Sequence, residues 1–130
     1  MVGEVSHFEI PYVKADRAKK FYGTVFGWKM NDVPEMNYTM VSTGPVDDKG
    51  RPTQLSVVNG GMMKRSTQIK APTVTITVDD IDKALERVKD EGGKVVMKKQ
   101  PVGEMGWTAY IKDTEGNVIG LWQRSEKSEQ

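Results

Sequence analysis

The feature that most constrains the fold is an internal repeat. The segment HFEIPYVKADRAKKFYGTVFGWKM, from His7, aligns without a gap with TVTITVDDIDKALERVKDEGGKVV, from Thr73, 66 residues further along. The alignment pairs identical residues: Ile10 with Ile76, Asp16 with Asp82, Ala18 with Ala84, and Gly27 with Gly93. Such self-similarity indicates one supersecondary unit used twice, so the fold must be assembled from two copies.

Each copy opens with a predicted strand followed by a helix. Phe8 and Ile10 alternate with His7 and Glu9, and the second copy alternates Val74, Ile76 and Val78 with threonines 73, 75 and 77. A period of two is typical of strands with one apolar face. The helices carry apolar stripes at helical spacing: Ala18, Phe21, Tyr22, Val25 and Phe26, then Ile81, Ala84, Leu85 and Val88. We therefore expect Phe21, Tyr22 and Phe26 in the core, an N-cap at Asp79 or Asp80, and helix ends at Gly27 and Gly92–Gly93.

Three further strands are predicted after each helix. They span residues 28–32, 38–42 and 54–63 in the first copy, and 94–98, 107–112 and 118–123 in the second, with a hairpin turn at 115–117. The expected organisation is one α+β domain, with a βαβββ module at about 5–64, a linker at 65–71, a second module at about 72–123 and a disordered tail at 124–130. One helix covers one face of each small sheet, so two tandem modules would form a curved mixed sheet around a cavity, with the helices outside. Concave surfaces of this kind are the usual small-molecule sites.

Composition excludes several classes of function. Nineteen basic and eighteen acidic residues leave a net charge of +1, which offers no strong field for nucleic acid or a membrane surface. The chain has no cysteine, so disulfides, thiol catalysis and thiolate metal sites are excluded. No stretch approaches the ~20 apolar residues of a membrane span. No basic segment precedes an apolar run at the N-terminus, so a cytoplasmic location is expected.

The two openings HFEIP…DRAKKFYGTVFGW and VDDIDKALERVKDEGGKVV, with the closing DTEGNVIGLWQ, resemble the glyoxalase/bleomycin resistance/extradiol dioxygenase superfamily. These are the vicinal oxygen chelate proteins, and the segments GGMMKR and GNVIGLWQ are most similar to their lactoylglutathione lyase-related branch. The resemblance covers residues 5–123. It implies a homodimer and a divalent metal held by four side chains, one from the first and one from the last strand of each copy. In such proteins the metal chelates two neighbouring substrate oxygens.

The sequence departs from that pattern at three of the four ligand positions. His7, the only histidine of the chain, stands at the first, and Thr73 stands at its counterpart. Glycines stand at the other two, Gly120 in the second copy and Gly60 or Gly61 in the first. Because borderline metals usually need several imidazole or carboxylate donors, we expect no metal cofactor and a site that has lost it.

The candidate site residues lie on the strand faces expected to line the cavity. His7 and Glu9 are candidates for an acid–base pair, with a hydrogen-bonded remnant of the family site as the alternative. Candidate ligand contacts are His7, Glu9, Gly61, Met63, Thr73, Thr75, Tyr110, Gly120 and Trp122. The alternative for the threonines is that they are present because threonine favours strands, and the alternative for the glycines is that they allow close packing. The alternative for Tyr110, Met63 and Trp122 is that their side chains fill the cavity and nothing binds there.

Three functions remain open. The leading one is a metal-independent protein that binds a small organic molecule, either sequestering it or acting on it through His7. The second is a metal-dependent lyase or isomerase of glyoxalase or epimerase type, which leaves open whether the chain is an enzyme. The third is a dimeric interaction module with a filled cavity, in which an exposed Trp107 belongs to the interface.

Overall fold

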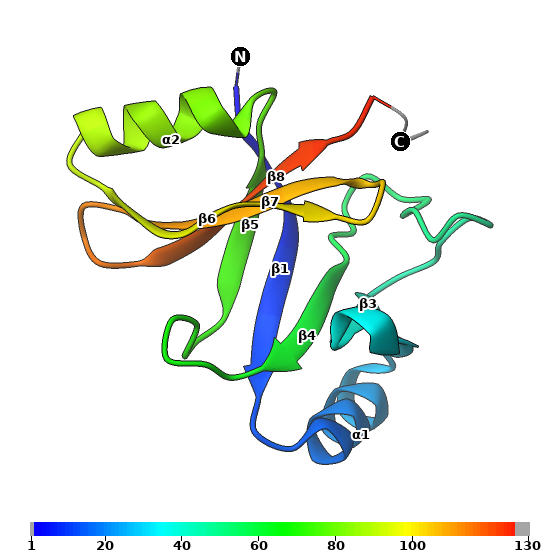
Figure 1. Ribbon diagram of the computed structural model, residues 1–130. Helices are drawn as coiled ribbons and strands as arrows, with labels where there is room; N and C mark the ends of the chain where they lie inside the picture. Colours follow the sequence, from blue (N-terminus) through cyan, green and yellow to red (C-terminus); the bar gives the residue numbers. More distant parts are fainter. Residues whose placement is uncertain (1, 127–130) are drawn as a thin grey trace. The chain divides into compact units, whose positions relative to one another are not determined.

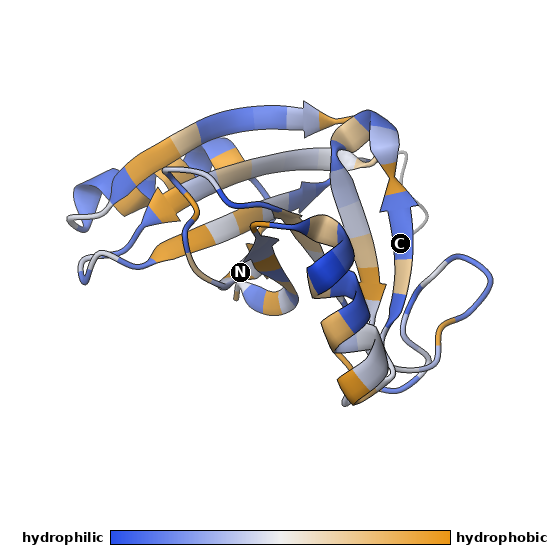
Figure 2. Ribbon diagram, turned by 90° about the horizontal axis from the view of Figure 1, so that it is seen from below, coloured by the Kyte–Doolittle hydropathy of each residue, from blue (hydrophilic) through white to orange (hydrophobic). Residues whose placement is uncertain are grey.

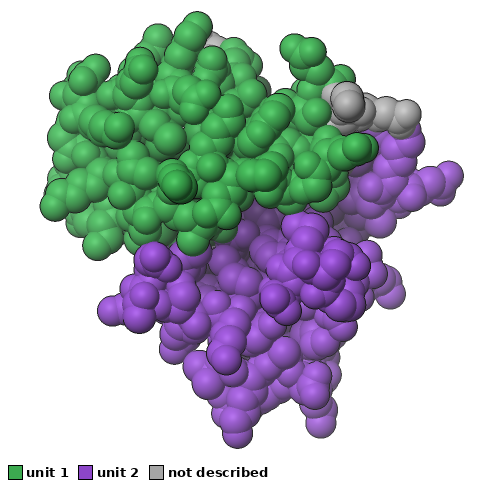
Figure 3. Space-filling view, in the orientation of Figure 1, with its two compact units in different colours: residues 1–6, 73–130 green, residues 7–72 purple. Residues whose placement is uncertain are grey.

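The computed structural model describes residues 2–126, which divide into two compact units (Figure 3). The first unit is His7–Pro72, and the second consists of residues 73–126 together with residues 2–6. Residues 2–6 belong to the second unit, where the hydroxyl groups of Ser6 and Thr77 form a hydrogen bond. Each unit contains one α-helix and four strands (Figure 1).

The first unit has a four-stranded mixed sheet in the order β2-β3-β4-β1. Its elements are β1 (Glu4–Tyr12), α1 (Ala15–Phe26), β2 (Lys29–Val33), the 3-10 turn η1 (Pro34–Met36), β3 (Tyr38–Ser42) and β4 (Gly60–Lys64). β1 and β4 are parallel, and the other neighbours are antiparallel. The unit is therefore a βαβββ module, as the repeat predicts.

The second unit repeats this arrangement, with the strand order β5-β8-β7-β6. Its elements are β5 (Thr73–Thr77), α2 (Ile81–Asp90), β6 (Lys94–Val102), β7 (Gly106–Lys112) and β8 (Val118–Arg124). β5 is parallel to β8, and β7 and β8 form the predicted hairpin. Asp113 closes that hairpin by accepting bonds from the backbone N–H groups of Glu115 and Asn117. The prediction of an α+β chain made of two βαβββ copies is confirmed.

Helix α2 is anchored in the core of the second unit. Asp80 is its N-cap, and the carboxylate accepts a bond from the Lys83 N–H at 3.2 Å. Ile81 has no exposed surface and belongs to a buried cluster on the helix-facing side of the sheet: Ala109, Ile111 and Leu121. Trp107 packs against this cluster, with the Lys99 ammonium 5.0 Å above its ring. Trp107 is therefore only partly exposed, and its suggested place in an interface stays a prediction.

Helix α1 is packed much less tightly than its stripe predicts, and none of its residues is buried. Phe21 is 54% exposed and Phe26 59% exposed, so the prediction that both lie in the core is wrong. Trp28 provides ring contacts for the helix, because Tyr22 stacks on it at 4.9 Å between ring centroids and Phe26 lies at 5.8 Å. The apolar residues Phe21, Val25 and Phe26 of α1 consequently remain exposed. Figure 2 colours the apolar and polar residues along each helix and strand. The helix ends at Gly27, whose φ of 72° forms the predicted left-handed C-cap.

Three strand boundaries also differ from expectation, and the first is that of β6, which extends to Val102 instead of ending at residue 98. β4 begins only at Gly60, because residues 54–59 form no strand ladder, and Val58 and Asn59 bond instead to Thr43. Asn59 Oδ1 accepts from the Thr43 N–H at 2.9 Å, and the Thr43 hydroxyl donates to the Val58 carbonyl at 2.8 Å. At the other end, Arg124 belongs to β8 and not to a disordered tail, while residues 127–130 of that predicted tail lie outside the described residues. Among residues 2–126, no helix is long and apolar enough to cross a membrane.

Candidate functional site

The sheet of the first unit gathers four of the predicted site residues on one face. β1 and β4 run parallel, with Glu9 opposite Gly61 and Pro11 opposite Met63. Because side chains alternate along a strand, His7 and Glu9 share their face with Gly61 and Met63. Gly60 pairs with Phe8 and belongs to the other face, so the position that corresponds to the family ligand is Gly61.

Tyr38 joins His7 and Glu9 into one hydrogen-bonded chain. β3 places Tyr38 opposite Met63, which brings its side chain to the same face. Its hydroxyl donates to Glu9 Oε2 at 2.7 Å and lies 2.8 Å from His7 Nε2. A phenol has one proton to donate, and the Tyr38 hydroxyl donates it to the Glu9 carboxylate. In the bond between the hydroxyl and His7, the Nε2–H of His7 must therefore be the donor and the hydroxyl oxygen the acceptor. The imidazole lone pair of neutral His7 is then on Nδ1, which is the atom able to accept a proton or a ligand donor.

Burial sets the protonation of His7. Glu9 is only 6% exposed, and His7 is partly buried. Desolvation lowers the pKa of His7 below its ordinary 6.5, and the nearby Glu9 carboxylate only partly opposes that shift. His7 is therefore neutral at physiological pH, in the tautomer that the hydrogen bonds require.

The lowered pKa of His7 predicts a pH-dependent stability. In the window between the lowered pKa and 6.5, the unfolded chain binds more protons than the folded chain. The contribution of His7 is therefore fully present above about pH 6.5 and is lost as the pH falls toward the folded-state pKa. Urea unfolding at about pH 7.5 and about pH 5.5 should show a larger loss for the native protein than for His7→Gln. Equal losses in the two proteins would contradict the neutral buried imidazole.

The place of a metal ligand at position 61 is taken by the Tyr38 ring. A Cβ built on Gly61 would overlap the Tyr38 hydroxyl and the ring carbons beside it. The two remaining donors, His7 and Glu9, are both bonded to the same phenol. Within residues 2–126, no group of three or more His, Cys, Asp or Glu side chains is placed to hold a metal ion. The donor set therefore does not fit the divalent metal that the resemblance implies.

The remaining predicted residues share a face of the second unit's sheet. Thr75 and Tyr110 both pair with Gly120, and Thr77 pairs with Trp122, which aligns the set: Thr73, Thr75, Tyr110, Gly120 and Trp122. Gly120 is required by close packing, because a Cβ there would lie 2.9 Å from the Thr75 hydroxyl oxygen. Thr73 is 5% exposed, and its buried hydroxyl has no hydrogen-bond partner among the described residues.

Two residues of the first-unit site were not predicted from the sequence. Tyr38 was identified only as the start of a strand, since its role depends on the register between β3 and β4. Asn59 immediately precedes β4, two residues before Gly61, and its buried Nδ2 has no partner among the described residues. The pair Gly60–Gly61 was the available signal, because glycine inside a strand indicates the close approach of another group.

Comparison with known proteins finds relatives named as bleomycin resistance-like proteins, glyoxylases or lactoylglutathione lyases. Residues 5–44 match the family described as bleomycin resistance protein-like, N-terminal. The protein named "Putative glyoxylase CFP32" of Mycobacterium bovis is 30% identical over 115 residues, which cover 82% of this chain and 40% of that protein. A lactoylglutathione lyase of Neisseria meningitidis is also 30% identical over 115 residues, covering 84% of this chain and 82% of the relative. The chain thus spans less than half the length of the mycobacterial relative.

Solved structures share the fold at low identity. A methylmalonyl-CoA epimerase of Streptomyces coelicolor, in complex with 2-nitronate-propionyl-CoA, superimposes with a TM-score of 0.66 at 15% identity. The match covers 100% of this chain and 99% of the epimerase. The family-level resemblance noted in the sequence therefore agrees with both the relatives and the fold.

Proposed function

Because this chain belongs to the glyoxalase/bleomycin resistance/extradiol dioxygenase superfamily, we propose that it binds a small organic molecule at His7 and Glu9 without the divalent metal. The observation that carries the proposal is the Tyr38 bridge. It holds His7 and Glu9 in a fixed hydrogen-bonded chain where a metal-dependent relative would need free donors.

The chain of hydrogen bonds can serve a ligand directly. Glu9 accepts from Tyr38, Tyr38 accepts from His7, and His7 Nδ1 remains available as an acceptor for a ligand N–H or O–H. The unpartnered Nδ2 of Asn59 adds a donor for a ligand carbonyl or hydroxyl oxygen. A molecule with a hydroxyl beside a carbonyl would suit these groups. His7 can also move a proton to or from such a molecule, with its tautomer set by Tyr38.

The rival function is a metal-dependent lyase or isomerase, which the name of the neisserial relative favours. It requires that His7 and Glu9 leave Tyr38 and that further donors complete the coordination. A metal content measurement separates the two functions.

We expect no stoichiometric metal in the purified protein and no stabilisation by nickel, zinc, manganese or iron(II). A metal at a free concentration about a hundredfold above its Kd would stabilise the fold by about 2.7 kcal/mol. A thermal unfolding experiment resolves a change of that size easily. Tyr38→Phe is the matched variant, because it frees His7 and Glu9 from the phenol but keeps both donors. One equivalent of metal in the native protein, with a stabilisation that His7→Ala abolishes, would favour the lyase and overturn the metal-free site.

A further inference from the structure

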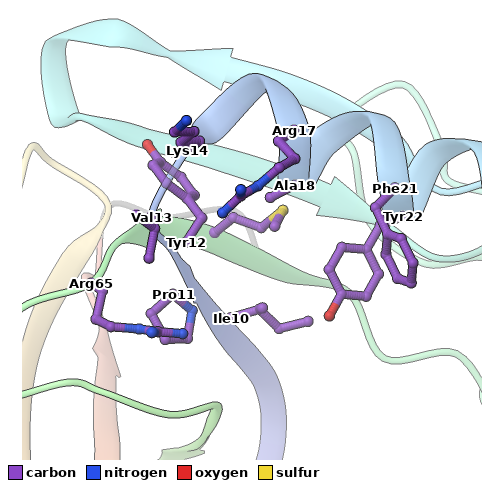
Figure 4. A pocket seen from close by; sticks show the side chains of 11 residues that line it. Ile10, Pro11, Tyr12, Val13, Lys14, Arg17, Ala18, Phe21, Tyr22 and Arg65 are labelled. Carbon is purple, nitrogen blue, oxygen red and sulfur yellow. The ribbon is translucent and has the colours of Figure 1, made fainter.

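A cavity of the first unit has its floor on the opposite side of the sheet from His7. It has a volume of about 430 Å³ and is bounded by α1 and by the ends of β1 and β4 (Figure 4). Ile10 and Met62 form its floor, and they pair with each other across β1 and β4. Since Glu9 and Gly61 alternate with that pair along the two strands, their side of the sheet is the other one. None of the residues predicted from the sequence as ligand contacts lines this cavity.

One part of the cavity is apolar. Ile10, Met62 and Ala18 are joined by the rings of Phe21 and Tyr22, which lie toward one end in Figure 4. Met62 is fully buried, whereas Phe21 remains 54% exposed at the rim. The apolar stripe of α1 therefore faces this cavity, and none of the residues of the helix is buried. The volume suits one or two fused rings or a short aliphatic chain.

The other end carries positive charge. Lys14, Arg17 and Arg65 line it, and Figure 4 shows their side chains on the side away from Phe21 and Tyr22. Among the described residues that line the cavity, none has a carboxylate. Nor does any of the three cations form an ion pair with a described acidic residue, whereas Lys19 on the same helix pairs with Asp32 at 3.0 Å. On a chain of net charge +1, three such cations around one cavity are a local excess.

We propose that this cavity is a second binding site, for a small amphipathic monoanion whose aromatic or short aliphatic body ends in a carboxylate. The body would lie against Ile10, Met62 and Phe21, which removes apolar surface from water. The carboxylate would bind Arg17 and Arg65, whose planar guanidinium groups match it in a bidentate manner. The proposal does not depend on the function of the His7 face, since the two sites use different residues.

The test uses 2-naphthoate as the probe and 2-naphthylmethanol as an uncharged probe of nearly the same shape. Titration calorimetry with the full chain should show one saturable site for 2-naphthoate and at least about tenfold weaker binding of the alcohol. The double variant Arg17→Gln, Arg65→Gln should weaken 2-naphthoate binding by about tenfold or more. Lys20→Gln, which removes an exposed charge from the same helix outside the cavity, should leave the affinity unchanged.

Several outcomes would overturn the proposal. These are no binding of 2-naphthoate, equal affinity for the alcohol, or an affinity that the double arginine variant does not change. A loss of 2-naphthoate binding in His7→Ala would place the probe on the other face of the sheet and would also overturn it. An Ala18→Phe variant, which fills the cavity, should abolish binding while circular dichroism shows that the fold is retained. If sedimentation shows a dimer that Ala18→Phe converts to a monomer, a second copy of the chain covers the cavity and the anion site is wrong.

Discussion

Gly61→Ala should cost about 2–3 kcal/mol of unfolding free energy, although it adds only one methyl group. The reason is the Tyr38 hydroxyl, which lies where the new Cβ would be built. Relief requires the Tyr38 side chain to rotate away, which breaks its bonds to both His7 and Glu9 and leaves a buried carboxylate with one partner fewer. Urea unfolding of the native and variant proteins measures the cost.

The control for this prediction is a double-mutant cycle. Tyr38→Ala removes the ring, so Gly61→Ala should cost much less in that background than in the native protein, and the two costs should not add. Gly60→Ala offers the contrast, because its Cβ would meet the backbone carbonyl of Phe8, which no side-chain change relieves. Additive costs for Gly61→Ala and Tyr38→Ala would show that the ring does not occupy the position above Gly61.

The exchange of a metal ligand for a phenol has a physical logic. A carboxylate buried beside an imidazole needs a partner for its charge or for its lone pairs, and a metal would provide one. With glycine at position 61, the Tyr38 ring can reach over the strand and give Glu9 a proton donor instead. The same phenol accepts from His7, so one side chain satisfies both groups that a metal would otherwise bind. A metal-free site, as proposed, would keep a defined geometry through this phenol.

Much of this site could be predicted from the sequence, because strand alternation and the repeat depend only on spacing. Alternation places His7 with Glu9, and the offset between the copies points to Gly61 and Gly120. Tyr38 could not be predicted, since its place over Gly61 depends on the antiparallel register that puts it opposite Met63. Asn59 was missed because residues 54–59 were assigned to a strand, whereas Val58 and Asn59 bond to Thr43 outside any ladder.

In the fold, too, features that depend on neighbouring residues could be predicted from the sequence, whereas features that depend on tertiary packing could not. The order of strands and helix in each copy, the cap at Asp80 and the left-handed end at Gly27 follow from local chemistry, and the structure confirms them. The packing of the two helices does not follow, because an amphipathic stripe shows only which face is apolar. The stripe of α2 meets a buried cluster, while that of α1 borders a cavity and rests on Trp28.

This difference between equivalent helices leads to the second large effect. Ile81→Ala should destabilise the protein by about 3–4 kcal/mol, because Ile81 is fully buried and its truncation leaves a cavity among well-packed neighbours. Phe21→Ala removes a larger side chain but should cost only about 1 kcal/mol, since more than half of Phe21 is already in contact with water.

Urea unfolding of both variants tests the contrast, and Ile81→Val is the matched control. That variant keeps the branch at Cβ and loses one methylene, so it should cost about 0.5–1.5 kcal/mol. A cost for Phe21→Ala as large as that for Ile81→Ala would mean that the stripe of α1 is buried in solution, either by closure of the helix onto its sheet or by another molecule. Because such burial would also fill the cavity beside Phe21, naphthoate binding to the native protein would be lost at the same time. The stability of one exposed phenylalanine therefore bears directly on whether the helix side of this sheet is a binding site.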